Sequence, residues 1–173
     1  MGVAGAGKSM QGRLLADKNG YAWISTGEIL RVLVTGKRRH EMLEGKLLSD
    51  AEMIRMIDKV LDLINLQEEF ILDGFPRTLK QADWLIDQVQ MERFKITAVI
   101  HLSASEDVVL ERLKQRGRQD DTEEAIRNRF EEYRAVTLPI ISDFKAKGIT
   151  VYDIDGSQSP EDVHNAIAQH VNV

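Results

Sequence analysis

Near its N-terminus the chain carries a glycine-rich loop: residues 2–9 read GVAGAGKS and satisfy the pattern G-x-x-x-x-G-K-[ST] in full. Glycines let successive backbone N–H groups converge on one point, and the helical stretch that follows, to about Lys18, adds partial positive charge at its N-terminus. Lys8 can neutralise phosphate charge, and the Ser9 hydroxyl can ligate Mg²⁺. The loop therefore predicts a binding site for a triphosphate.

The sequence before this loop is unusually short for the pattern. A loop of this kind normally follows a buried strand, yet only Met1 precedes Gly2. Two interpretations stay open: the sequence begins inside its first strand, or the protein works with a stub of that strand. With the strand absent, we expect an empty central position in the sheet and a lower stability.

The rest of the chain alternates short apolar or β-branched runs with longer stretches of helical periodicity. The runs cover Ala22–Ser25, Phe70–Asp73, residues 97–103 and residues 149–154. Alternating β and α elements imply a parallel sheet, and fully apolar strands fit a sheet that helices cover on both faces. The sequence predicts an α/β fold with a doubly wound parallel sheet of the P-loop NTPase type. Pro139 should kink or split a helical pattern over about residues 122–147.

Composition narrows the classes of function. The 173 residues include 23 Lys and Arg against 28 Asp and Glu, and a net charge of −5 gives no general field for nucleic acid. The absence of Cys excludes disulfides, thiolate zinc sites and cysteine nucleophiles. No apolar run approaches the roughly 20 residues of a membrane span, and no signal peptide is recognisable. We therefore expect a cytoplasmic protein with no nucleic-acid or membrane partner.

Three further segments resemble one family when they are taken with the loop. They read ISTGEILR at residues 24–31, FILDGFPRT at residues 70–78 and RQDD at residues 118–121. The chain closely resembles the adenylate kinases, nucleoside monophosphate kinases that interconvert ATP plus AMP with two ADP. The resemblance runs essentially from end to end, and DGFPR is highly specific. It implies one kinase domain over residues 1–173, with an embedded AMP-binding subdomain at about residues 26–66.

The expected metal residues combine a strand end with the loop. Asp73 ends an apolar strand, at the sheet edge where α/β proteins bind their ligands. A carboxylate that faces a phosphate loop holds the metal, although a helix-capping Asp is the alternative. In the family this Asp orients Mg²⁺ through its water shell. The resemblance thus implies Mg²⁺ as the cofactor, with Ser9 and Asp73 as its residues.

The resemblance assigns ATP to the loop and to one arginine beyond it. The implied ATP-binding residues are Gly5, Ala6, Gly7, Lys8, Ser9, Met10 and Arg112. In the family the arginine that matches Arg112 stacks on the ATP base. Met10 departs from the family, which usually has Gly and then Thr after the lysine, so the metal position could shift by one residue.

The AMP side centres on Arg77, which lies on a Gly/Pro-shaped turn just past Asp73 and whose rigid fork can grip a phosphate bidentately. The resemblance implies that the AMP-binding residues are Thr26, Arg31, Gly74, Arg77 and Gln81. The matching Thr lines the AMP pocket and the matching Gln reads the adenine edge, which favours AMP over UMP or CMP. Ser25 with Glu28, and Thr78 with Gln81, also fit helix capping boxes, so a structural role stays open for both.

Four arginines fall within a short span near the RQDD segment. Arg112 and Arg116 stand four residues apart on one helical face, where like charges repel by roughly 0.2–0.5 kcal/mol. Two phosphate-bearing substrates would supply the counter-charge, and a salt-bridged helix surface is the alternative. The resemblance implies that the catalytic residues, which clamp the moving phosphoryl group, are Lys8, Arg77, Arg116, Arg118 and Arg129.

The lid of the family is almost deleted here. Only Gly117 separates Arg116 from Arg118, so the minimal lid covers about residues 116–120, and residues 32–44 also look trimmed. Since lid closure excludes water from the γ-phosphate, we expect weaker ATP capture and some ATP hydrolysis without transfer.

The resemblance leaves other functions open. The expected partners are ATP, AMP and ADP, bound by a monomer. One alternative keeps the fold but uses another nucleoside monophosphate or a small alcohol as the acceptor. Another is a nucleotide-binding module that has lost turnover.

Overall fold

The computed structural model describes residues 1–36, 48–117 and 121–171. In these ranges four parallel strands form two pairs: β1 (Ala22–Ser25) with β2 (Phe70–Asp73), and β3 (Val99–Ser103) with β4 (Val151–Asp155). Each strand falls within two residues of a segment that the sequence predicts to be extended. The trimmed stretch expected within residues 32–44 lies largely outside the described residues.

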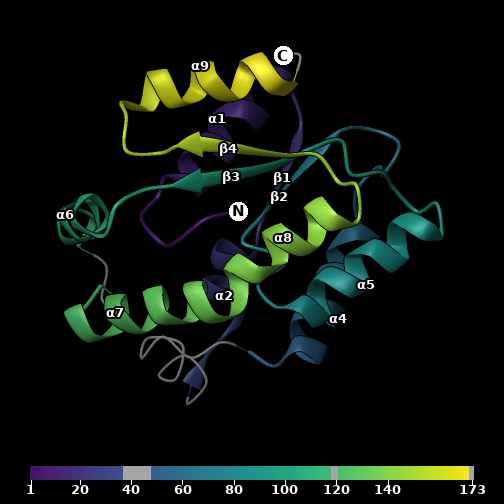
Figure 1. Cartoon of the computed structure of the whole chain (residues 1–173). Helices are drawn as coiled ribbons and strands as arrows, with labels where there is room; N and C mark the ends of the chain where they lie inside the picture. Colours follow the sequence, from purple (N-terminus) through teal and green to yellow (C-terminus); the bar gives the residue numbers. More distant parts are fainter. Residues whose placement is uncertain (37–47, 118–120, 172–173) are drawn as a thin grey trace.

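Helices cover both faces of these strands, as a doubly wound fold requires (Figure 1). The described helices are α1 (Lys8–Asn19), α2 (Thr26–Leu33), α4 (Asp50–Leu61), α5 (Leu79–Gln90), α6 (Glu106–Arg116), α7 (Glu123–Glu132), α8 (Leu138–Ala146) and α9 (Pro160–Val171). Helices α1 and α9 pack together on one face, while α2 contacts β2 and α8 contacts β4 on the other. Within the described ranges, no helix has the length and apolarity needed to cross a membrane.

The two strand pairs do not join into one continuous sheet among the described residues. Residues 1–3 run beside β3, where the N–H of Leu102 donates to the carbonyl oxygen of Met1 over 2.9 Å and the Met1 amino group donates to the carbonyl oxygen of Ile100. Beyond these hydrogen bonds, the pair β1–β2 and the pair β3–β4 share no strand hydrogen bonds among the described residues.

Apolar side chains of the helices pack against each strand pair and form two core clusters. One core cluster joins β1 to α2, α4, α5 and α8, with Ile57, Leu61 and Ile140 fully buried. A second cluster joins β3 and β4 to α6, α7 and α9 around Val109 and Leu113. Burial of one such side chain contributes about 1.5–3 kcal/mol. These two clusters attach the strand pairs to the helices that cover them.

The helical pattern over residues 122–147 is split, as Pro139 predicts. Helix α7 ends at Glu132, a π-helical turn η1 (Tyr133–Thr137) follows, and α8 begins at Leu138. Pro139 has no N–H to donate to the carbonyl four residues earlier. The turn is instead closed by the N–H of Leu138, which donates to the carbonyl of Tyr133 five residues back. Such π-turns are rare and often lie at functional sites.

Neither of the two capping boxes that the sequence allows is complete, since Gln81 Oε1 accepts from the N–H of Arg77 rather than from that of Thr78. The Thr78 hydroxyl caps α5 by accepting a hydrogen bond from the backbone N–H of Gln81 over 3.2 Å. Ser25 makes no side-chain hydrogen bond to α2, so the capping box expected of Ser25 with Glu28 is wrong. Glu28 instead pairs with Arg31 one turn along the helix, at 2.5 Å.

Candidate active site

The glycine-rich loop wraps around the N-terminus of α1, as the sequence predicts. Gly2 has a φ of 134°, and a Cβ atom at this position would collide with the carbonyl oxygen of Leu102 on β3. Only glycine permits this approach of the loop to the strand. Gly7, the N-cap residue of α1, has no side chain that could accept hydrogen bonds from the backbone N–H groups of the first turn.

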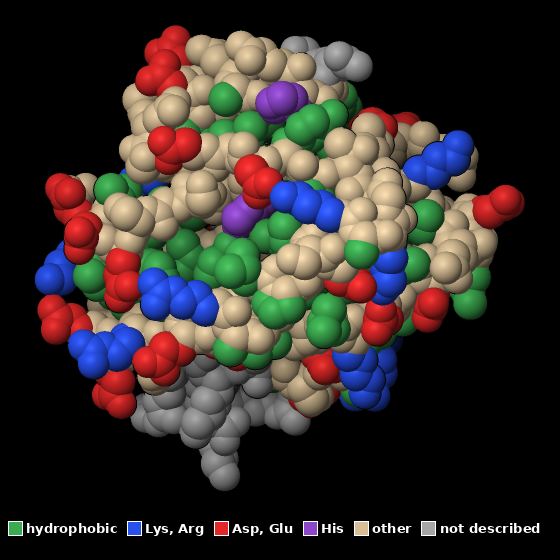
Figure 2. All heavy atoms as spheres, in the orientation of Figure 1, with side chains coloured by type: hydrophobic (Ala, Val, Ile, Leu, Met, Phe, Trp, Pro, Cys, Tyr) green, Lys and Arg blue, Asp and Glu red, His purple; other side chains and the backbone are tan. Residues whose placement is uncertain are grey.

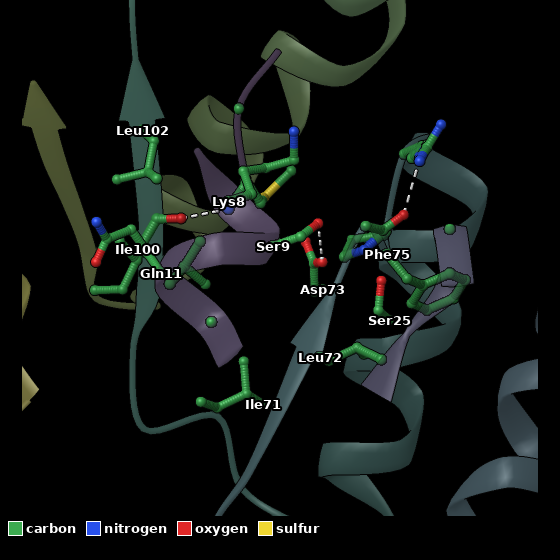
Figure 3. Close-up of a pocket in the computed structure, with 18 of the residues that line it drawn as sticks. Lys8, Ser9, Gln11, Ser25, Ile71, Leu72, Asp73, Phe75, Ile100 and Leu102 are labelled. Atoms are coloured by element: carbon green, nitrogen blue, oxygen red, sulfur yellow. Dashed lines mark hydrogen bonds between the residues drawn. The ribbon is translucent and has the colours of Figure 1, made fainter. Parts of the chain in front are cut away.

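Lys8 is the cation at the centre of the loop. Its Nζ donates to the carbonyl oxygen of Val3 over 2.7 Å (Figure 3). The pKa of Lys8 is lowered from 10.5 to about 8, chiefly by burial; the charge of Asp73 opposes this lowering, and the charges of Arg77 and Arg116 add to it. The ammonium charge is therefore poorly compensated in this state, and a bound polyphosphate would favour it.

Ser9 and Asp73 meet at the end of β2. The Ser9 hydroxyl donates to the Asp73 carboxylate over 2.6 Å, and Asp73 is 7% exposed (Figure 3). The carboxylate faces the loop rather than capping a helix. A hydroxyl and a carboxylate are hard oxygen donors of the kind that Mg²⁺ takes alongside substrate phosphates and water. These two residues therefore fit the expected metal, whereas Met10, half-exposed on α1, carries no oxygen donor in its side chain.

The segment after Asp73 forms a rigid turn that presents Arg77. Gly74 has a φ of 83°, and a Cβ there would collide with the hydroxyl of Thr26. Arg77 is tied at three points: Nε donates to the carbonyl of Gly74 over 2.9 Å, its N–H donates to Gln81 Oε1 over 2.8 Å, and its carbonyl accepts from the Thr137 hydroxyl over 2.9 Å. Burial lowers the pKa of Arg77. The guanidinium group is thus held in place before any ligand arrives.

The other residues expected at AMP surround this turn. Arg31 and Gln81 line the same cavity as Arg77, whereas Thr26 lies beneath it, fully buried, with its hydroxyl donating to the carbonyl of Asp73 over 3.2 Å. Gln81 is fully buried, and its Nε2 donates to Asp50 Oδ1 over 2.8 Å. Sequence reasoning missed Asp50, because nothing local links it to a glutamine 31 residues away.

Two of the expected catalytic arginines share one carboxylate. Arg116 donates to both oxygens of Asp121 at 2.8 and 2.5 Å, and Arg129 approaches Asp121 Oδ1 at 3.4 Å. The Asp121 side chain is only 2% exposed, so this pairing is shielded from water. Arg118 lies outside the described residues. The structure therefore supplies part of the counter-charge from within the protein, as the salt-bridge alternative anticipates.

Arg112 has its own set of partners on the loop after β4. Its guanidinium group donates to the carbonyl oxygens of Gly156, Ser157 and Gln158 at 2.5, 3.1 and 3.1 Å. Sequence reasoning missed these acceptors, because backbone carbonyls leave no residue-type signal. They hold the arginine against the loop that follows β4.

Glu132 was also missed as a site residue. Burial raises the pKa of Glu132, while the charges of Arg77 and Arg129 oppose this rise. The carboxyl group therefore feels the positive charges of two arginines that come from different segments of the chain. Its only sequence signal is its place three residues after Arg129, on the same helical face.

One cavity of about 1660 Å³ connects these groups. Its lining includes the whole glycine-rich loop, Asp73 and the six described cations expected in the site, which are Lys8, Arg31, Arg77, Arg112, Arg116 and Arg129. The cavity continues between β2 and β3, where Ile71 and Ile100 flank it (Figure 3). A phosphate loop, an acidic strand end and a ring of cations around one cavity define a P-loop nucleotide-binding protein.

Comparisons with known proteins narrow this class. A model of the adenylate kinase family matches residues 1–149. An adenylate kinase of Corynebacterium urealyticum is 38% identical over 172 residues, which cover 96% of this chain and 93% of the relative. Adenylate kinases of Parasynechococcus marenigrum and Leptospira biflexa are 37% and 36% identical, with 98% and 99% of this chain and 94% and 97% of the relatives covered. The chain belongs to the adenylate kinase family.

Proposed function

We propose that this protein transfers a phosphoryl group from Mg²⁺-bound ATP to AMP and gives two molecules of ADP. The observation that carries the proposal is the single cavity in which Lys8 and Ser9 of the loop meet Arg77 of the DGFPR turn. The names of the relatives support the same reaction. Arginines from α6 and α7 add positive charge along the path between the two ends.

In the proposed reaction ATP lies over the glycine-rich loop and AMP enters on the side of Arg31, Arg77 and Gln81. A phosphate oxygen of AMP attacks the γ-phosphorus in line, so no covalent enzyme intermediate is needed. Catalysis then consists of positioning and charge stabilisation. When bound, Mg²⁺ supplies Lewis-acid neutralisation of the phosphates, and Ser9 and Asp73 would hold it.

The arginines stabilise the charge that develops on the transferring group. Arg77 is fixed by its three backbone and side-chain contacts, so little reorganisation is needed when the phosphate arrives. Arg116 and Arg129 are kept at the cavity edge by Asp121. We assign to Arg118 the same role, on the family resemblance alone.

The lid of this protein is proposed to be minimal. Helix α6 ends at Arg116 and α7 begins at Glu123, so only residues 117–122 connect the two helices in sequence. A connection of this length provides little cover for the γ-phosphate, and water then competes with AMP as the acceptor. We also propose that the protein acts as a cytoplasmic monomer, with an AMP-binding part at about residues 26–66.

A coupled assay for ADP tests the reaction and the acceptor together. The full chain is incubated with ATP, Mg²⁺ and AMP, and in parallel with UMP, CMP or shikimate in place of AMP. We expect ADP formation that depends on AMP and is at least tenfold slower with the other acceptors. Equal rates with UMP or CMP would favour the broader acceptor class, and tight nucleotide binding without ADP would favour a module without turnover.

A further inference from the structure

A chain of four side chains leads from α8 across the strands to the start of the π-turn. Lys145 Nζ donates to Asp153 Oδ2 over 2.7 Å, Asp153 Oδ1 bonds His101 Nδ1 over 2.6 Å, and His101 Nε2 bonds the Tyr133 hydroxyl over 2.5 Å. His101 on β3 and Asp153 on β4 are register partners, so their side chains share one face of the strand pair. On the face of the molecule drawn in Figure 2, a histidine lies beside an acidic and a basic side chain near the middle of the view.

The chemistry of these four groups fixes which one donates and which one accepts in each hydrogen bond. Hydrogen bonds from Lys145 and His101 lower the pKa of Asp153, so its carboxylate is ionised and only accepts. The hydrogen of the neutral His101 ring therefore lies on Nδ1, and burial, which lowers the pKa of His101, favours this neutral form. Nε2 is then an acceptor, and the Tyr133 hydroxyl donates to it. His101 thus fixes one position for that hydroxyl.

Tyr133 in turn begins the element that faces the arginines. It is the first residue of η1, and its carbonyl accepts the hydrogen bond that closes the π-turn. At the other end of η1, the Thr137 hydroxyl donates to the carbonyl of Arg77 over 2.9 Å. Glu132, just before Tyr133, interacts with the charges of Arg77 and Arg129.

Pro139 disfavours a regular α-helix at this point, and a contact from outside the turn at its first residue adds to what holds the rare π register. A shift by one residue rotates the following side chains by about 100° around the helix axis. Such a shift would carry Thr137, at the end of the turn, away from the carbonyl of Arg77. The anchor at Tyr133 opposes this shift.

We propose that His101, acting through the Tyr133 hydroxyl, holds η1 in its π register and thereby positions Arg77 for phosphoryl transfer. Nothing in the reaction itself requires this histidine, which lies on the strand beside the cavity rather than in the ring of cations. His101 and Tyr133 are positioning residues, since neither is expected to touch the reacting atoms. The inference rests on the proposed function.

Two variants remove the anchor, and one keeps it. Tyr133→Phe deletes the hydroxyl, and His101→Leu deletes both ring nitrogens. His101→Gln keeps an amide that can donate to Asp153 and accept from Tyr133. Tyr152→Phe is the matched control, because Tyr152 stands next to Asp153 on β4 but points to the opposite face, where its ring stacks on His170 at 4.2 Å.

A misplaced Arg77 should destabilise the transition state more than it weakens substrate binding, because many groups share the binding of the substrates. We expect Tyr133→Phe and His101→Leu to lower kcat about tenfold while the KM values for ATP and AMP stay within about twofold. His101→Gln should recover most of kcat, and Tyr152→Phe should leave it unchanged. The inference is overturned if Tyr133→Phe and His101→Leu lower only the Tm, or if His101→Gln is as slow as His101→Leu.

Amide hydrogen exchange over residues 129–137 separates this inference from the proposed function. We expect exchange there to be at least about tenfold faster in the nucleotide-free His101→Leu variant than in the parent and in His101→Gln. Equal exchange in all three proteins overturns the anchor, whether or not ADP is formed. Absence of ADP formation by the parent protein defeats the proposed function, and the exchange data then decide the anchoring of η1 alone.

Discussion

The Ser9 hydroxyl donates a 2.6 Å hydrogen bond to the carboxylate of Asp73, and this contact joins the glycine-rich loop to the end of β2 across 64 residues of sequence. It brings the two expected metal residues together before any ligand is bound. Because both are held by regular elements, α1 and β2, their spacing is set by the fold rather than by a loop.

Asp73→Asn tests this pair. The amide keeps the size of the side chain and can still accept from Ser9, but it removes the negative charge that holds a cation. We expect kcat to fall at least about tenfold and the Mg²⁺ concentration for half-maximal rate to rise. Steady-state assays over a Mg²⁺ titration measure both, with Asp83→Asn as the control, since Asp83 pairs with Lys147 on the surface. An unchanged Mg²⁺ dependence would remove Asp73 from the metal site.

Arg77→Lys tests the phosphate fork. Lysine keeps the charge but loses the planar donors that grip a phosphate bidentately, and it cannot reproduce the bond from Nε to the carbonyl of Gly74. We expect kcat to fall by roughly 100-fold or more while the Tm changes by only a few degrees. Arg93→Lys, whose arginine pairs with Asp58 and Asp62, is the matched control. A near-normal rate for Arg77→Lys would show that its assigned role is wrong.

The short connection between α6 and α7 predicts leakage of ATP to water. Without AMP, the protein should hydrolyse ATP several-fold faster than a relative with a compact but intact lid, because less of the chain covers the γ-phosphate. Release of inorganic phosphate from ATP alone, in both proteins under the same conditions, gives the comparison. Equal and negligible hydrolysis would argue that the site is closed by other means.

The buried histidine of β3 predicts a loss of stability in mild acid. Burial lowers the pKa of His101 below its ordinary value of 6.5, so the folded state favours the neutral ring. The contribution of the neutral His101 ring to the free energy of unfolding is fully present above about pH 6.5. It is lost as the pH falls through the pKa that His101 has in the folded state. In urea titrations between pH 7 and pH 5, His101→Gln should therefore lose less stability than the parent.

His164 titrates in the same sense and is present in both proteins, so its contribution cancels in this comparison. Burial lowers the pKa of His164. An identical pH dependence for the parent and His101→Gln would mean that the His101 ring is as easily protonated in the folded protein as in the unfolded chain.

Local sequence patterns were sufficient for the strands, the glycine-rich loop and the break at Pro139. Each depends on residues that are close together in sequence: an apolar run of four or five residues, a glycine pattern before a helix, or a proline without an N–H donor. The capping box considered at Ser25 does not form, and the reason is again a contact between residues that are close in sequence. Glu28 pairs with Arg31 along α2 instead of reaching back to the start of the helix.

The contacts that fix the site could not be predicted in the same way. Arg77 is held by Thr137 from 60 residues away, and Arg112 by carbonyl oxygens more than 40 residues away. The pairing of Arg116 and Arg129 through one buried carboxylate depends on how α6 and α7 are packed. A single sequence identifies the types of residue at such a site but not which long-range partner each one has.

The central claim is that two nucleotides meet end to end within one ring of cations. A crystal structure of the protein with two adenosines joined by five phosphates tests it most directly. We predict that the phosphates run from the glycine-rich loop to Arg77, with Lys8, Arg116 and Arg129 in contact with them. Arginine side chains that point into bulk solvent, with the ligand bound elsewhere, would contradict the account.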